Sequence, residues 1–153
     1  MAHGEYASDS LRDMSRKNRE VSKLSDTAIA SLRAAAAESL PAVRDLAIRG
    51  PGVLAGCDGL VPGFCLHDEL QALAAAGLSP LRVLQTATIN PAKYFGRDKV
   101  QGTIEADKRA DLVLLDSDPL LDIRNTQRIA AVIVRGRLIS RTEIARILAA
   151  HRR

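Results

Sequence analysis

The hydrophobic period of this sequence changes once, after "NPAKYFG", and that change limits the folds open to the chain. Before it, apolar residues recur at helical spacing: in "LHDELQALAAAGLSP", Leu66, Leu70 and Leu73 share one face. Gly77 ends that helix. After it, short apolar runs alternate with turn residues, which is typical of strands. We therefore expect a mainly helical unit and a β-containing unit joined near residue 97.

The helical unit carries local start and stop signals. The stretch "SDTAIASLRAAAAESL" begins with Ser25 or Asp26 as N-cap, and Pro41 is expected to interrupt its helix before "PAVRDLAIRG" continues. Two further helices each begin with a capping residue followed by Pro, at 79–80 and at 90–91. Residues 1 to about 20 lack apolar periodicity, and we expect them to be a frayed arm or a piece cut from something larger.

In the second unit we expect three strands and a closing helix. The strands are predicted near Gly102–Glu105, at Ala110–Asp116 and at Ile129–Val134, the last turning through Arg-Gly-Arg. The final helix begins at Ser140, where "SRTE" is a capping box.

Composition argues against several classes of function. The 22 Lys and Arg residues are scattered among 18 acidic ones, giving a net charge of +4, and aromatic residues make up only 3%. Nucleic acid is therefore not an expected partner, because such a site needs a clustered basic face with stacking aromatics. No apolar run is long enough to span a membrane. The polar, partly acidic N-terminal stretch is neither a signal peptide nor a convincing transit peptide.

Two cysteines, Cys57 and Cys65, are too few for a disulfide framework, and no C-x-x-C motif is present. A reduced, cytoplasmic chain is the resulting expectation. Cys57 is expected to be a buried, unreactive side chain, although a thiol can also act as a soft metal ligand.

The stretch "VLAGCDG" places a carboxylate, Asp58, at the end of a short apolar run between two glycines. We predict a buried strand over Val53–Asp58, followed by a loop and a helix. In α/β barrels, catalytic groups lie at the carboxyl ends of strands, where a carboxylate can bind a divalent metal and take a proton from metal-bound water. The alternative is a turn cap or an Asx turn.

Five pieces, in order over about residues 53–139, resemble the C-terminal part of the amidohydrolase superfamily, and most of all its imidazolonepropionase-like and prolidase-like members. The pieces are the Gly-X-Asp strand end, the "EL…AGLSP" helix, "ATINPAKYFG", "GTIEADKRADLVLLD" and the closing "VIVRGRLI" pair. Two departures are Cys57, which replaces the usual Thr, and the absence of the family's Gly before Lys108.

The resemblance implies a fold and a site. The fold would be α/β: the last βα unit or units of a metal-dependent (β/α)₈ barrel, plus C-terminal strands of a small β-sandwich. Asp58 matches the family's final Asp, which ligates metal and serves as general base. His67 could face substrate from the loop above the strand, or could be a capping or surface residue. Asp111 and Asp116 match the sandwich motif and would be structural.

The remaining metal ligands of the family are missing. The chain has only His3, His67 and His151, and none forms the H-x-H motif. A complete barrel takes about 250 residues, so an incomplete barrel and a gene or protein fragment are expected. We expect a divalent metal, zinc, to bind only if other sequence supplied the missing ligands.

We expect an N-terminal arm at 1–24, a terminal barrel segment at 25–97, a β-sandwich segment at 98–139 and a C-terminal helix at 140–153. The predicted function is metal-dependent hydrolysis of carbon–nitrogen bonds in a small amide, cyclic amide or peptide. A barrel-bearing partner chain or self-association could complete the enzyme. The alternative is a non-catalytic remnant or scaffold without a metal site.

Overall fold

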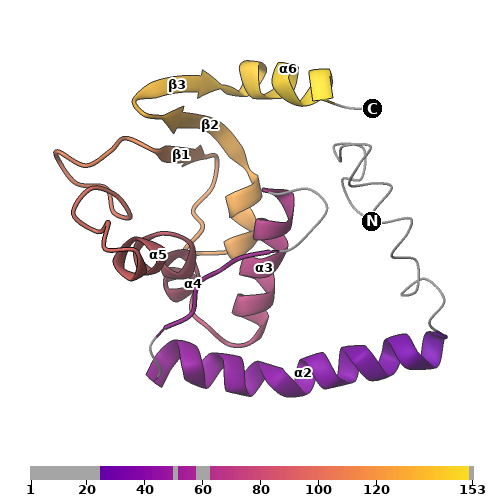
Figure 1. Cartoon of the computed structure of the whole chain (residues 1–153). Coiled ribbons are helices and arrows are strands. Elements are labelled where there is room, and N and C mark those ends of the chain that lie inside the picture. Colours follow the sequence, from indigo (N-terminus) through magenta and orange to yellow (C-terminus); the bar gives the residue numbers. More distant parts are fainter. Residues whose placement is uncertain (1–24, 50–51, 58–62, 152–153) are drawn as a thin grey trace.

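The computed structural model describes residues 25–49, 52–57 and 63–151. Helices come first and a small sheet follows (Figure 1). The helices are α2 (Asp26–Arg49), α3 (Phe64–Ala75), α4 (Pro80–Ala87) and α5 (Ile89–Tyr94). The second part holds β1 (Leu112–Leu115), the 3₁₀ helix η3 (Ile123–Gln127), β2 (Ile129–Val134), β3 (Arg137–Ser140) and α6 (Arg141–His151). The mixed α/β class is thus confirmed, and so is the predicted order of a helical part followed by a part with strands.

Helix α2 begins where the sequence predicts, with the Ser25 hydroxyl accepting a hydrogen bond from the Ala28 N–H at 3.2 Å. The predicted interruption at Pro41 is wrong, because the helix runs through that residue without a break. A proline removes one backbone donor from a helix. The neighbouring Leu40 and Val43 pack against the core cluster, and this tertiary packing compensates for the lost bond.

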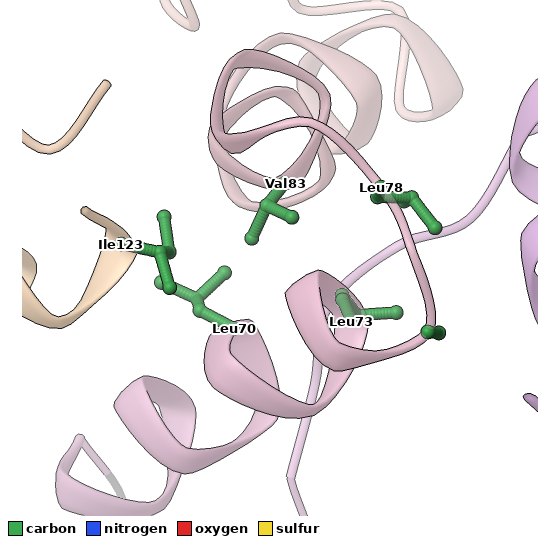
Figure 2. Close-up of a cluster of buried hydrophobic side chains, with 6 residues drawn as sticks. Leu70, Leu73, Leu78, Val83 and Ile123 are labelled. Carbon is green, nitrogen blue, oxygen red and sulfur yellow. The ribbon is translucent and has the colours of Figure 1, made fainter. Parts of the chain in front are cut away.

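The hydrophobic core lies between α3, α4 and η3. Leu70 and Leu73 of α3 face Val83 of α4, and Ile123 of η3, which lies about 40 residues further along the chain, packs in the same cluster (Figure 2). Val83 is fully buried. Gly77 ends α3 with a φ of +96°, as the sequence predicts, and Ser79 caps α4 through the Arg82 N–H at 3.5 Å.

The sheet has three antiparallel strands in the order β1-β2-β3. Leu112 lies opposite Ile133, which in turn lies opposite Leu138. The β2–β3 turn uses Arg135 and Gly136, both with positive φ. Its first residue is held by Asp111, whose carboxylate accepts the Arg135 N–H at 2.7 Å.

The strand predicted at Gly102–Glu105 is absent from the described structure, where these residues form bends and coil. Gly102 has a φ of +100°, and a Cβ built on it would lie 2.6 Å from the Ala92 Cβ of α5. The backbone here lies directly on a helix, which accounts for the departure from strand geometry. The described residues contain one sheet only, so the second layer of a sandwich remains a prediction.

Helix α6 packs beside β2 and β3, and its N-terminus follows the predicted motif in part. The Ser140 hydroxyl accepts the Glu143 N–H at 3.3 Å. The Glu143 carboxylate pairs with Arg137 at 2.9 Å and so ties the helix to β3. Among the helices described, none combines the length and the apolar character needed to cross a membrane.

Candidate functional site

The chain leading to Asp58 is the first feature of the candidate site, and Asp58 itself lies outside the described residues. Residues 52–57 have no regular secondary structure, so the predicted strand is wrong for the described part of Val53–Asp58. Strands need hydrogen-bonded neighbours on a sheet, and the described chain offers this segment only helices. Its apolar residues Val53 and Ala55 are half-buried against the core cluster.

Two hydrogen bonds hold this segment against α4 and α5. The Ala55 N–H donates to the Thr86 carbonyl at 3.0 Å. The Asn90 side-chain amide donates to the Val53 carbonyl at 3.2 Å. Asn90 is therefore not the cap of α5 that the sequence predicted: it lies inside the helix, and its amide satisfies a backbone carbonyl of the segment before Asp58.

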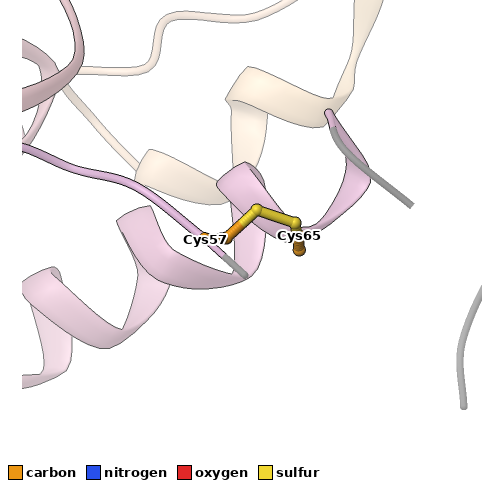
Figure 3. Close-up of a disulfide and its surroundings, with 2 residues drawn as sticks. All are labelled: Cys57 and Cys65. Atoms are coloured by element: carbon orange, nitrogen blue, oxygen red, sulfur yellow. A yellow bond between two sulfur atoms is a disulfide. The ribbon is translucent and has the colours of Figure 1, made fainter. Parts of the chain in front are cut away.

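Cys57 and Cys65 are joined by a disulfide, with their Cα atoms 5.9 Å apart (Figure 3). The expectation of reduced, buried cysteines is thus wrong: Cys57 is exposed and Cys65, in the first turn of α3, is half-buried. The available signal was their separation of eight residues across a Gly- and Pro-containing loop. A disulfided Cys57 has no thiolate to offer as a metal ligand.

His67 lies on α3 rather than on a loop, and its side chain faces the protein. Its Nδ1 is 3.1 Å from the Thr126 hydroxyl oxygen of η3. The only hydrogen on that hydroxyl is donated to the Ile123 carbonyl at 2.8 Å, so Nδ1 carries the proton and donates to Thr126. Burial lowers the pKa of His67 below its usual 6.5, against a smaller opposing effect of Asp68. These contacts give His67 a packing role between α3 and η3.

A cavity of about 600 Å³ lies between the end of α2, the segment at 52–54 and helices α4 and α5. Its lining combines apolar side chains with two cations and several neutral polar groups. The residues are Ala47, Ile48, Gly52, Val53, Leu54, Leu78, Arg82, Gln85, Thr86, Asn90, Lys93 and Tyr94. No carboxylate, imidazole or thiol is among them, so this lining lacks the side chains that zinc prefers.

The described residues do not fit a metal centre. Within them, no three His, Cys, Asp or Glu side chains come together at ligating positions. His67 is already committed to Thr126, and the cysteines are paired with one another. A zinc site needs three or four such ligands, so we derive no chemical step through a metal from this part of the chain.

The comparisons with known proteins assign the class. A family model described as the amidohydrolase family matches residues 1–139, and the chain belongs to that family.

Similarity to individual proteins covers part of each. The chain is 39% identical over 72 residues to an adenine deaminase of Desulforamulus reducens, and this alignment covers 47% of this chain and 11% of that protein. A solved Xaa-Pro dipeptidase with bound methionine superimposes with a TM-score of 0.60 at 25% identity, over 66% of this chain and 25% of that one. A candidate prolidase from Bifidobacterium longum gives 0.65 at 27% identity, over 87% of this chain and 35% of that one. The chain thus spans well under two thirds of each of these relatives.

Proposed function

We propose that this chain forms the C-terminal portion of a metal-dependent amidohydrolase that hydrolyses carbon–nitrogen bonds. The observation that carries the proposal is the family match over residues 1–139, combined with coverage of only 11% to 35% of the relatives described above. The substrate would be a small molecule. Adenine and Xaa-Pro dipeptides, which appear in the names of the relatives, are the first substrates to test.

In this proposal Asp58 is the one residue of the chain that belongs to the metal site. It would ligate the metal and accept a proton from the attacking water, as a carboxylate at this place in the family motif does. The other ligands, and the zinc or other divalent ion, would depend on sequence outside this chain. His67 is left out of the substrate site, because its Nδ1 is hydrogen-bonded to Thr126 of η3.

The supporting structural observation is the anchoring of the segment before Asp58. Bonds from Ala55 to Thr86 and from Asn90 to Val53 give that segment a defined path across α4 and α5. A catalytic group needs this kind of support, since small displacements cost orders of magnitude in rate.

We propose the cytoplasm as the location of the protein.

The test is reconstitution. The chain would be co-expressed with the barrel-coding sequence of a homologous amidohydrolase, and the complex assayed for bound zinc and for hydrolysis of adenine and of dipeptides. We expect Asp58→Asn to abolish hydrolysis and leave the complex intact. The matched control is Asp45→Asn, an exposed carboxylate on α2, which should retain full activity. Wild-type rates for Asp58→Asn would refute the catalytic assignment.

The second candidate is a non-catalytic remnant or scaffold, which the absence of a metal-ligand cluster from the described residues favours. In that case no barrel sequence restores zinc binding or hydrolysis. Asp58→Asn would then change only the thermal stability of the chain, and by little.

A further inference from the structure

We propose that Cys57 and Cys65 are a reversible dithiol–disulfide pair, a redox modification site that fixes the end of the segment 52–57 to the first turn of α3. The pair is formed by the fold and is open to small thiols and disulfides from solvent. Three observations carry this proposal: the spacing of the two residues, their unequal exposure, and the few restraints on Cys57 that the described residues show. The position of Cys57 in the sequence gives its consequence.

The spacing is that of a bridge that needs no backbone movement. The Cα atoms of Cys57 and Cys65 lie 5.9 Å apart, inside the 4.4–6.8 Å usual for disulfides. One cysteine ends a segment held by α4 and α5, and the other lies in a helix whose next turns form the core. The fold therefore keeps both sulfur atoms within reach of each other.

The exposure of the two residues gives the exchange a direction. Cys57 is exposed and Cys65 is half-buried, so a small disulfide such as oxidised glutathione meets Cys57 first. The Cys57 thiolate attacks one glutathione sulfur, forms a mixed disulfide and releases one glutathione thiolate. The Cys65 thiolate then attacks the Cys57 sulfur and releases the second. Two protons and two electrons leave the protein, and oxidised glutathione is reduced to two thiols.

Among the described residues, the disulfide is the restraint that we find on this segment beyond Ala55. The last backbone bond that we find along the described part of it is Ala55 to Thr86. Gly56 follows in open space, where an added Cβ would have no atom within 4 Å. Reduction would thus remove this restraint from Gly56 and Cys57 and leave Val53 and Ala55 attached to the helices.

Cys57 directly precedes Asp58 in the sequence. If Asp58 is the catalytic base, oxidation would fix the backbone next to it, and the redox state of the pair would set the activity of the assembled enzyme. This consequence rests on the proposed function, whereas the redox pairing does not.

The experiment measures thiol–disulfide equilibrium on the full chain. Reduced protein is equilibrated with graded mixtures of reduced and oxidised glutathione, quenched with iodoacetamide, and weighed by mass spectrometry, in buffer and again in urea. We expect a closed form that is lighter by two hydrogen atoms than the reduced, unalkylated chain. The effective thiol concentration of the pair should be at least tenfold higher in buffer than in urea. By linkage the same tenfold factor, about 1.4 kcal/mol, is the stability that the disulfide adds to the fold.

The single variants test the order of events. Cys65→Ser and Cys57→Ser should each take up one glutathione and stop there, with Cys57 in the first variant reacting faster than Cys65 in the second. On reduction of the wild-type chain, amide exchange should accelerate at Gly56 and Cys57 and change little at Ala55.

Three results would overturn the proposal. Equal effective concentrations in buffer and urea would mean that the fold does not bring the pair together. Disulfide-linked dimers in place of the closed monomer would show that the sulfurs prefer other chains. Loss of helical circular dichroism on reduction would mean that the bond is a structural requirement and not a reversible switch.

Discussion

The imidazole of His67 on α3 donates to the hydroxyl of Thr126 on η3, across 59 residues of sequence. Thr126 is buried, and its hydroxyl donates a hydrogen bond to the Ile123 carbonyl. The bond therefore joins the helical unit to the segment that leads into β2. The bond needs a hydrogen on Nδ1, and burial keeps the ring itself neutral.

His67→Ala should lower the free energy of unfolding by about 1 kcal/mol at pH 7.5, the usual worth of a hydrogen bond between neutral groups. His67→Asn should lose less, because its amide nitrogen can take the place of Nδ1 as donor. Urea unfolding followed by circular dichroism measures both. Equal losses for the two variants would show that ring packing, and not the hydrogen bond, is what His67 contributes.

The same residue predicts a pH dependence. Because burial lowers the pKa of His67 in the folded chain, the unfolded chain binds a proton first as the pH falls below about 6.5. The stability contributed by neutral His67 is thus complete above that pH and declines below it. Comparing urea midpoints from pH 7.5 to pH 5, we expect a smaller decline for His67→Asn than for the wild type. Parallel pH curves would remove His67 as the cause.

Gly102→Ala should be strongly destabilising. Its new Cβ would lie 2.6 Å from the Ala92 Cβ and 3.1 Å from the Ile89 Cα, at a φ of +100° that side chains rarely adopt. We expect a loss of at least about 2 kcal/mol. The control is Gly56→Ala, which has open space around it and should lie within about 1 kcal/mol of the wild type. The melting temperature of each variant measures the difference. Equal melting temperatures for Gly102→Ala and the control would contradict the close contact of Gly102 with α5.

Val83→Ala tests the core of α3, α4 and η3. Val83 is fully buried, so its truncation removes two methyl groups and leaves a void, at a cost of about 2–3 kcal/mol. Val113 on β1 is 57% exposed, and Val113→Ala should cost well under half as much. Chemical denaturation of both variants gives the comparison, and similar losses would place the core elsewhere.

Asp111 supports the β2–β3 turn through its carboxylate. The Arg135 N–H, followed by the nearby Arg109, holds the pKa of Asp111 below its usual 3.8. The support is therefore present above about pH 4 and declines as the pH falls through the lowered pKa. Asp111→Asn should keep slow amide exchange at Arg135 and lose its acid dependence, whereas Asp111→Ala should lose the protection at every pH. Unchanged exchange in Asp111→Ala would refute this role.

Local signals in the sequence were reliable where the structure is set by neighbours a few residues apart. The cap at Ser79, the helix end at Gly77 and the turn after Val134 depend on backbone geometry within one turn of chain. The predictions failed where distant packing decides. Pro41 stays inside a helix that docks on the core, and Gly102 leaves strand geometry because α5 lies beneath it.

The candidate site was less predictable for the same reason. The disulfide depends on how residues 52–57 are placed against the first turn of α3, which the eight-residue spacing alone does not determine. The contact of His67 with η3 depends on a segment almost sixty residues away. Asp58 remains a prediction from the family motif, since it lies outside the described residues.

The place of Ile123 in the core has a consequence for how this protein can be divided. The hydrophobic period changes near residue 97, yet Ile123, well beyond that point, packs with Leu70 and Val83. A chain cut at residue 97 would keep α3 and α4 and lose the side chain that fills the space beside them. The two units therefore share a core, and recombination at this joint would separate Ile123 from the other buried residues of the cluster.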